Sequence, residues 1–472
     1  MEKAPQWKVI FVNTVQLLKL FIEPRSVALV GLTRSTGPLA WNTLEHLLNY
    51  GFKGKLYPVN PSANEILGVK CYPSIQEIPD DIDLAVILTP RSVVPKLIKE
   101  CTEKGIKAIT VVGQGFADGD AEGKELQAEI VRIAREGGAR IMGPNTFGTA
   151  NAFINFSSAF VHTDMQKVPT GIICQSGLFF GGLPKFPILG KGIDLGNACD
   201  IDFSDGLEYF EDDPDIKVIL LYIEGLKDGR RFIEVASRVA KKKPIIAVKS
   251  GQSEAAALAA QSHSGSLAGR DEVFDTAFKK CGVIRVTAAE EFHDLSKAFQ
   301  RLPLMKGRGI GIITMTGGGG IMATDACARH NLSLAKLSPE SVRKLDALAP
   351  SWQHFENPAD IWPPSMISGI PLPAMIRNTL ETYLVDDNVH GVMIIMPPFP
   401  SKYANLVFES IKLTNKFEKP VVIWLYGTEV DDLVSWLENE GRILYYPTMD
   451  QALNVLSRLN DYYEYLNRDN DI

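Results

Sequence analysis

The sequence predicts an α/β protein made of three consecutive doubly wound parallel-sheet domains. Short apolar, β-branched runs such as SVALVG and DLAVILTP alternate with amphipathic segments of helix length. Continuous apolar strands separated by helices are typical of a parallel sheet that is covered on both faces. The alternation starts afresh at GIICQSG and again at GIGIITMTGGGG, and the 472 residues suffice for about two to four domains.

The first predicted domain covers residues 1–150. Its opening segment, VIFVNTVQLLKLFIEP, is interrupted by Asn13, Gln16 and Lys19 and has no small-residue cleavage site, so we interpret it as a surface helix and expect no transmembrane segment. The predicted strands that follow are SVALVG, KLYPV, DLAVILTP, AITVVG and ARIMGPN. Strands in this rhythm, with helices between them, predict a Rossmann-like domain.

The second predicted domain covers residues 151–304 and contains the strands GIICQSG, KVILLYIEG, KKPIIAVKSG and VIRV. The third, residues 305–472, contains GIGIITMTGGGG, VHGVMIIMPP, KPVVIWLYG and RILYYP. Its Pro-rich insert, ENPADIWPPSM, is expected to be an ordered loop or packing arm rather than a linker.

Composition excludes several classes of function. The formal charge of −7 and the scarcity of basic runs argue against a nucleic-acid partner. The cysteines show no CxxC or Cys/His ligand spacing, which argues against a disulfide framework and a structural metal site and fits a reducing cytoplasm; they are Cys71, Cys101, Cys174, Cys199, Cys281 and Cys327.

In open parallel sheets ligands bind beyond the carboxyl ends of the strands, so the residues after each apolar run are the candidates. The first turn, VGLTRSTGPLA, offers backbone N–H groups and Arg34 to a phosphate at a helix N-terminus. It is not a GxGxxG sequence, and Asn60 stands where a dinucleotide reader usually has an acidic residue. A phosphate-bearing nucleotide is therefore favoured over NAD, the alternative being a turn that binds nothing.

Further strand ends would complete one rim with this turn. They are LTPRS (88–92), GQGF (113–116) and MGPNTFG (142–148). Rigid proline and glycine turns along the whole rim suit a long, extended ligand.

Two small-residue turns predict anion sites at helix starts. CQSGLFFGG offers the N–H groups of Ser176 and Gly177, and MTGGGGIMATDAC places Gly317, Gly318, Gly319 and Gly320 before a helix. The two helix starts could clamp one anion between them. The alternative is that each glycine turn serves only packing and chain reversal.

His263 lies in the run QSHSGSLAGRDE, where small residues leave its ring accessible. A ring that is mostly neutral at pH 7 can act as a nucleophile and carry a phosphoryl group. Glu224, directly after the apolar strand VILLYI, is the candidate carboxylate that would fix its tautomer. The alternatives are a loop hydrogen-bonding role for His263 and a helix N-terminal charge for Glu224.

Together these motifs resemble the α subunit of ADP-forming acyl-CoA synthetases (acetate–CoA ligases), relatives of succinyl-CoA synthetase. The resemblance runs through PVNP, GPN, QSG, GN..D, YIEG, SHSGSLAG, the tetraglycine run and NPADI. It implies a CoA-binding first domain followed by two flavodoxin-like domains. It also implies a phosphohistidine at His263 with Glu224 as its partner, and phosphate binding at Ser176–Gly177 and at the tetraglycine run.

The resemblance implies that CoA, a substrate here, binds the first-domain rim. The implied contacts are Gly31, Thr33, Arg34, Ser35, Asn60, Pro61, Leu88, Thr89, Pro90, Gln114 and Asn145. The three domains use the whole length, so the family's ATP-grasp module, with its Mg²⁺ and ADP or ATP, is expected on a separate β subunit, in a hetero-oligomer such as α2β2. The implied reaction converts acyl-CoA, ADP and phosphate reversibly into carboxylate, CoA and ATP.

The chain departs from the family pattern near the expected acyl site. Bulky residues, which would reshape the substrate pocket, stand where the family usually has GPNCxG and QSGAxG; they are Thr146, Phe147, Leu178, Phe179 and Phe180. Two alternatives remain at this point. One is a catalytically degenerate module that binds CoA or acyl-CoA, and the other is a nicotinamide-dependent dehydrogenase, which the first turn and Asn60 disfavour.

Overall fold

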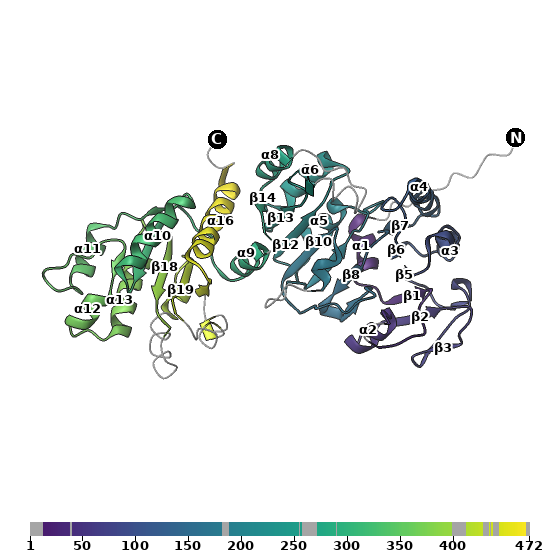
Figure 1. Cartoon of the computed structure of the whole chain (residues 1–472), viewed down its shortest axis with the longest axis horizontal. Coiled ribbons are helices and arrows are strands. Elements are labelled where there is room, and N and C mark those ends of the chain that lie inside the picture. The colour runs from purple at the N-terminus through teal and green to yellow at the C-terminus, as the bar shows by residue number, and fades with distance from the viewer. Residues whose placement is uncertain are drawn as a thin grey trace. The chain divides into compact units, whose positions relative to one another are not determined.

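The computed structural model describes residues 13–37, 40–181, 188–253, 255–256, 271–288, 290–398, 412–427, 434, 436–437 and 443–468. The chain folds into two compact units, residues 1–293 and 294–472 (Figure 1). Parallel sheets with helices between the strands confirm the predicted α/β class.

The first sheet of unit 1 has five parallel strands in the order β2-β1-β5-β6-β7. They are β1 (Ser26–Val30), β2 (Lys55–Val59), β5 (Leu84–Ile87), β6 (Ala108–Val111) and β7 (Arg140–Met142). Every residue of β1, β5 and β6 is buried, as the unbroken apolar runs predict. The helices that follow are α2 (Thr43–Tyr50), α3 (Val94–Glu103) and α4 (Ala121–Glu136), and a small hairpin pairs β3 (Glu65–Ile66) with β4 (Val69–Lys70).

The second sheet of unit 1 has seven strands in the order β14-β13-β12-β10-β11-β8-β9. They are β8 (Gly148–Asn151), β9 (Phe156–Ser157), β10 (Thr170–Cys174), β11 (Lys191–Asp194), β12 (Val218–Ile223), β13 (Ile245–Lys249) and β14 (Val283–Val286). Strand β8 pairs antiparallel with both β11 and β9. Residues 148–150, expected in the first domain, therefore belong to the second sheet.

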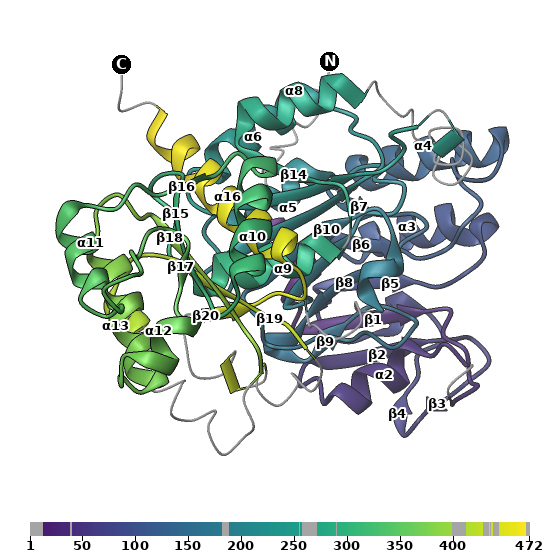
Figure 2. The ribbon, with the colours of Figure 1, turned by 60° about the vertical axis from the view of Figure 1, so that its left-hand side comes forward.

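The helices of the second sheet follow its parallel strands, and their bounds are α5 (Phe203–Glu211), α6 (Gly229–Val239), α8 (Asp271–Cys281) and α9 (Glu290–Arg301). Helices α5, α6 and α8 contact one another in that order, and Figure 2 shows α6 and α8 side by side over the strands. Helix α5 begins with a capping box in which Asp202 and Asp205 each accept the other's backbone N–H.

Helix α1 (Thr14–Ile22) is not the surface helix that the sequence predicts. Its side chains Leu17, Leu18, Phe21 and Ile22 are buried. The helix packs against α5, β6 and β8, and so contacts both sheets of unit 1 (Figure 1). Of the three polar residues that suggested a surface position, Asn13 caps the helix, and Gln16 and Lys19 are exposed on one side of it, while the opposite side forms the contact.

Unit 2 holds a six-stranded sheet in the order β16-β15-β18-β19-β20, with β17 paired to β15. The strands are β15 (Gly309–Thr314), β16 (Ser333–Leu334), β17 (Ala359–Asp360), β18 (Gly391–Met396), β19 (Val421–Leu425) and β20 (Ile443–Tyr445). Its α-helices are α10 (Gly317–Arg329), α11 (Pro339–Asp346), α12 (Trp362–Ile367), α13 (Leu372–Val385) and α16 (Met449–Asn467). Helices α10 and α16 lie on one face and α11 and α13 on the other (Figure 2). The Pro-rich insert is ordered and contributes β17 and α12.

Within the described part of the chain, no helix is both long and apolar enough to cross a bilayer. All six cysteines are free thiols, and burial raises the pKa of several of them, Cys174 among them.

Candidate functional site

The turns predicted to form the ligand rim lie side by side at the carboxyl edge of the first sheet. Val30 of β1 pairs with Val59 of β2 and with Ile87 of β5, and Ile87 pairs in turn with Val111 of β6. The sheet therefore brings together the predicted CoA residues that follow these strands, which are Gly31, Thr33, Arg34, Ser35, Asn60, Pro61, Leu88, Thr89, Pro90 and Gln114.

Gly31 and Thr89 are in close contact at the centre of this rim. Gly31 has φ +83°, and a Cβ added there would lie 2.3 Å from Cγ2 of Thr89. The positive φ and the lack of room for a Cβ each require glycine at this position. The Oγ1 atom of Thr89 is buried, and no hydrogen-bond partner for it lies among the described residues.

Asn42 orders the first turn, a role that our sequence reasoning missed. Its Nδ2 donates to the carbonyl oxygens of Thr33 and Ser35 at 3.0 Å each, while its Oδ1 accepts the N–H groups of Leu44 and Glu45 at the start of α2. The side chain thereby leaves Arg34 exposed. The available signal was an asparagine directly before an amphipathic helix, which is the usual position of an N-cap.

Asn145 joins the rim to the second sheet. It has φ +59°, and its N–H donates to the carbonyl of Gly113 at 2.9 Å. The preceding Pro144 accepts the N–H of Asn197, also at 2.9 Å. The GPN turn is therefore held between the two edges from which the predicted site is built.

At the carboxyl edge of the second sheet, Glu224 follows β12 directly and is only 5% exposed. Its backbone N–H donates to Oε1 of Gln175 at 2.8 Å, and the N–H of Gly225 donates to the same oxygen at 3.0 Å. Gln175 follows the neighbouring strand β10, so one side chain links the predicted phosphate turn to the predicted carboxylate. The sequence placed Glu224 correctly at the strand end but gave no role to Gln175.

The predicted phosphate turn at Ser176–Gly177 forms a short 3-10 helix, η4 (Gly177–Phe180), rather than an α-helix within the described residues. Ser176 caps it by accepting the N–H of Leu178 at 3.4 Å. The chain between 182 and 187 lies outside the described residues, and so does the predicted nucleophile His263.

Lys249 is a buried cation at the same edge. It pairs in register with Ile223, the residue before Glu224, and is 1% exposed. Its Nζ donates to the carbonyl of Ser250 and lies 4.8 Å from the ring centroid of Phe274. Burial lowers the pKa of Lys249, while the charges of Asp271 and Glu224 oppose this shift.

The residues predicted for the acyl pocket separate into two groups. Thr146 is buried and donates its hydroxyl to the carbonyl of Asp194, and Phe179 packs in the interior against Tyr222 and Phe292. Phe180 is also buried. Phe147 is only half-buried and Leu178 is exposed, so these two present side-chain surface next to the phosphate turn.

Asp194 connects this surface to the interior. It ends β11, and its carboxylate accepts the N–H of Phe147 at 2.7 Å and that of Gly196 at 3.3 Å. Burial raises the pKa of the Asp194 carboxyl to about 6, against the lowering effect of these hydrogen bonds.

In unit 2 the tetraglycine run is the first turn of α10 itself, because the helix begins at Gly317. The residue before it, Thr316, makes no side-chain cap. The first N–H groups of a helix have no partner within it, so this turn presents backbone donors. The predicted clamp between this turn and Ser176–Gly177 remains a prediction.

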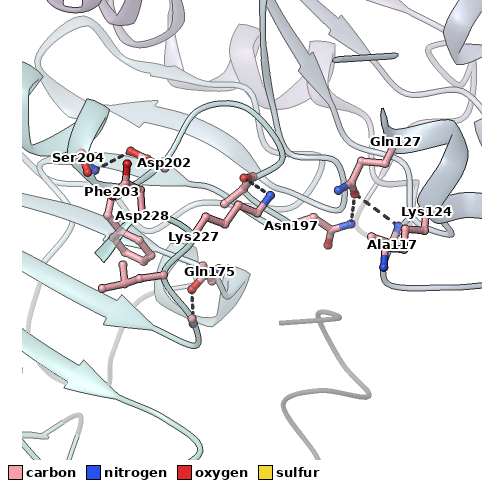
Figure 3. A pocket seen from close by; sticks show the side chains of 13 residues that line it. Ala117, Lys124, Gln127, Gln175, Asn197, Asp202, Phe203, Ser204, Lys227 and Asp228 are labelled. Atoms are coloured by element: carbon pink, nitrogen blue, oxygen red, sulfur yellow. Dashed lines mark hydrogen bonds between the residues drawn. The ribbon is translucent and has the colours of Figure 1, made fainter. Parts of the chain in front are cut away.

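A pocket of about 440 Å³ opens beside Gln175 (Figure 3). Asn197 forms part of its wall, and its Nδ2 donates to Asp118 and Gln127 at 2.7 and 3.0 Å. Lys227 donates to the carbonyl of Ala198 at 2.7 Å, and burial lowers the pKa of its ammonium group. These contacts join residues 29 to 79 positions apart, which explains why the sequence gave no sign of the pocket.

Within the described residues no group of three or more His, Cys, Asp or Glu side chains is suited to a metal ion.

Three known family domains match the chain in sequence. They are a CoA binding domain over residues 25–152, a succinyl-CoA ligase like flavodoxin domain over 169–299 and a ligase-CoA domain over 310–465. Their order agrees with the order of the three sheets.

The chain is also similar to known proteins over almost its whole length. The chain is 36% identical to acetate–CoA ligase (ADP-forming) I subunit alpha from Pyrococcus furiosus, over 94% of this chain and 97% of that one. It is 36% identical to acetate–CoA ligase (ADP-forming) II from Archaeoglobus fulgidus, over 96% of this chain and 68% of that one. The dinucleotide forming acetyl-coenzyme A synthetase 1 of Ca. Korarchaeum cryptofilum, solved with phosphate and ADP, superposes with a TM-score of 0.85 at 33% identity and covers 96% of this chain and 99% of that chain.

The fold and the three matching domains are those of a CoA-dependent ligase that joins an acid to a thiol. The chain belongs to the family of ADP-forming acyl-CoA synthetases, and in extent it corresponds to their α subunit. The alternative of a catalytically degenerate binding module is not favoured, because the similarity to named ligases extends over all three sheets.

Proposed function

We propose that this α subunit works through a phosphohistidine at His263 and passes the phosphoryl group to a nucleotide held by a separate β subunit. The observation that carries the proposal is the position of Glu224, a carboxylate buried at the end of β12. Its backbone N–H donates a hydrogen bond to the side chain of Gln175. A carboxylate in such a position can orient an imidazole and stabilise the cationic ring that forms on phosphorylation.

The reaction consists of three reversible steps. Phosphate attacks the thioester carbonyl of acyl-CoA, the carbon–sulfur bond breaks, and acyl phosphate and free CoA result. An imidazole nitrogen of His263 then attacks the phosphorus, and the carboxylate leaves. Finally a terminal phosphate oxygen of ADP attacks the phosphohistidine, which gives ATP and free histidine. Such steps need positioning and charge stabilisation more than covalent help from the protein.

The rim of the first sheet would bind CoA, with the exposed turn ordered by Asn42 among its contacts. The N–H groups of Ser176, Gly177 and the first turn of α10 would bind the phosphate. Mg²⁺ and the nucleotide belong to the β subunit, which we expect to be an ATP-grasp protein that assembles with this chain as α2β2. The free thiols fit a reducing cytoplasm.

Phosphate labelling tests the relay. The chain is mixed with its ATP-grasp partner and Mg²⁺-ATP labelled at the γ-phosphate, and acid-labile, base-stable phosphate on this chain is measured. We expect label on the wild type, none on His263→Ala, and slower labelling of Glu224→Gln. Absence of label from the wild type, with a partner that is folded and binds ATP, would overturn the proposal.

A further inference from the structure

Asp194 is a buried carboxylate that lies next to the turn proposed to hold phosphate. The residue is only 2% exposed. Its Oδ1 accepts the thiol of Cys174 at 3.9 Å, and Cys174 ends β10 just before Ser176 and Gly177. Its Oδ2 accepts the N–H of Phe147, whose ring would lie 2.7 Å from a Cβ added to Gly177. Both oxygens of the carboxylate are therefore bonded to residues that contact or adjoin the phosphate turn.

No cation pairs with Asp194 within the described part of the chain. The carboxylate accepts the backbone N–H groups of Phe147 and Gly196 and the thiol of Cys174, which burial keeps in its neutral form by raising its pKa. A carboxylate that is held only by neutral donors keeps its whole negative charge when it ionises. Removing such a charge from water is costly, and burial accordingly raises the pKa of Asp194 to about 6.

The segments that adjoin Asp194 carry no charged side chain; they are residues 143–151, 175–181 and 195–199. Their one titratable group is the thiol of Cys199, and burial raises its pKa to about 12. On the other side of β10, Glu224 follows β12, and its negative charge also raises the pKa of Asp194. The buried cation Lys249 ends β13, one strand further away. The charged neighbour that acts on Asp194 therefore has the same sign.

We propose that Asp194 takes up a proton when phosphate binds at Ser176–Gly177, and that this proton enables the site to hold a dianion. The proposal deepens the proposed function and rests on the phosphate site assigned there. A phosphate dianion bound by the N–H groups of this turn adds negative charge beside a buried carboxylate. Like charges at a buried position oppose each other's ionisation, so a carboxylate without a cation binds a proton instead.

Glu224 has a different role at the same edge of the sheet. Its proposed partner is the ring of His263, which becomes cationic on phosphorylation, so a negative charge on Glu224 is favourable at that step. Asp194 has no such partner among the described residues. A protonated carboxyl group still has an oxygen that accepts hydrogen bonds, so the N–H of Phe147 can keep its acceptor. The surrounding turns can therefore keep their positions in both protonation states of Asp194.

The affinity for the anion should depend on pH in a defined direction. At pH 7 the free carboxyl group, with its pKa of about 6, is mostly ionised, and it binds a proton when the anion arrives. The affinity therefore rises as the pH falls from above 7 towards about 6, by up to about tenfold per pH unit. Below about pH 6 this dependence disappears, because Asp194 already holds its proton before the anion binds.

Sulfate is the probe for the test, because it stays a dianion over this range, whereas phosphate itself exchanges protons near pH 7. The complex of this chain with its β subunit, without nucleotide, is titrated calorimetrically with sulfate at pH 7 in buffers of different ionisation enthalpy. This gives the number of protons taken up per ion bound. All chains carry His263→Ala, so that the histidine ring cannot account for the proton.

We expect the chain with Asp194 to take up about 0.5 proton or more in excess of the Asp194→Asn chain. The Kd for sulfate should rise with pH above about 6 in the former and change much less in the latter. Equal proton uptake by the two chains would overturn the proposal.

Glu224→Gln is the matched control, since it removes the other buried carboxylate of this edge, and it should keep most of the proton uptake. Loss of the uptake in Glu224→Gln but not in Asp194→Asn would assign the proton to Glu224 and contradict the proposal. Infrared difference spectra test the chain with Asp194 in place, in case Asp194→Asn does not fold. Sulfate should produce the C=O band of a protonated carboxyl group, and absence of this band would also refute the proposal.

The phosphate site and the proton uptake can fail separately. Sulfate binding without additional proton uptake would refute the role of Asp194 and leave the phosphate site intact. Absence of both sulfate and phosphate binding would refute the phosphate site and, with it, this proposal. Labelling of His263 in the wild type reports on the relay independently of both.

Discussion

Oε1 of Gln175 lies 2.8 Å from the backbone nitrogen of Glu224, and it accepts the next N–H, that of Gly225, as well. The two residues are 49 positions apart and follow neighbouring strands. One neutral side chain thus sets the path of the backbone that carries the proposed catalytic carboxylate.

Replacing Gln175 tests this restraint. Gln175→Met keeps the length of the side chain but removes the acceptor, so we expect a loss of about 1–3 kcal/mol in the free energy of unfolding, because two N–H groups lose their partner away from water. Gln175→Glu keeps the acceptor and should restore most of the stability, but it places a second negative charge beside Glu224 and should slow phosphohistidine formation. Urea denaturation and phosphate labelling measure the two effects. If Gln175→Met proved as stable as the wild type, the restraint would be of no energetic importance.

The stability of the wild type should depend on pH through Asp194. The raised pKa of about 6 means that the folded state holds a proton which the unfolded state, with an ordinary value of 3.8, has already released. Stability therefore falls as the pH rises from about 4 to about 6, by about 3 kcal/mol in total.

Asp194→Asn cannot titrate, so its stability relative to the wild type should improve over the same interval. Denaturation of both proteins at pH 4, 5, 6 and 7 measures this. A difference between them that is constant with pH would show that Asp194 titrates at its ordinary value.

Asp200 should be far more important for stability than an exposed carboxylate in a similar ion pair. Its buried side chain accepts from Arg135 at 2.6 Å and from Arg140 at 2.8 Å. We expect Asp200→Asn to cost about 1.5–3 kcal/mol, because charge-assisted hydrogen bonds to a buried carboxylate are lost, while the arginines themselves stay in contact with water. Glu136→Gln is the control: Glu136 pairs with Arg132 on the surface of α4 and should contribute about 0.5 kcal/mol or less. Similar losses in thermal or urea denaturation would contradict the burial argument.

Gly31→Ala and Gly37→Ala separate the effect of backbone strain from that of crowding at the rim proposed to bind CoA. Both glycines have positive φ, +83° and +100°, so each alanine carries a backbone cost of about 1–2 kcal/mol. Only at Gly31 would the new methyl group collide with Thr89, since no atom of the described residues lies within 4 Å of a Cβ at Gly37. We expect Gly31→Ala to raise the Kd for CoA about tenfold or more, a change of about 1.4 kcal/mol, and Gly37→Ala to raise it much less, by calorimetry on the full chain. Equal effects would mean that Thr89 does not contact CoA.

The alternation of apolar strands and amphipathic helices was sufficient to predict three parallel sheets, because a strand that is buried on both faces is an unbroken run of apolar residues in the sequence. It was not sufficient to assign β8. Gly148–Asn151 continues the chain from the first sheet but pairs with β11 of the second, and periodicity says nothing of which sheet a strand joins. Helix α1 was misplaced for a related reason, since its exposed polar side and its buried side alternate within the same nine residues.

The positions of the candidate site residues were predictable where these residues directly follow a strand. Glu224 and the rim turns follow apolar runs in the sequence, and the sheet then aligns them. Gln175 and Asn42 were missed because each acts by hydrogen bonds to the backbone of other segments, and such bonds leave no pattern in the local sequence. The ring contacts that link Trp41 to Phe160 and Phe160 to Phe147 were also missed, because these residues come together only in the folded chain.

The end of α1 is completed by residues synthesised much later. The carbonyls of Phe21 and Ile22 accept hydrogen bonds from the side chains of Thr149 and Asn151, 128 and 129 positions further along. A ribosome that adds about 5–20 residues per second therefore needs several seconds or more to supply these partners. Until residues 149–151 have been added, the two carbonyls lack these side-chain partners, so the end of α1 can take its final form only after β8 has been made.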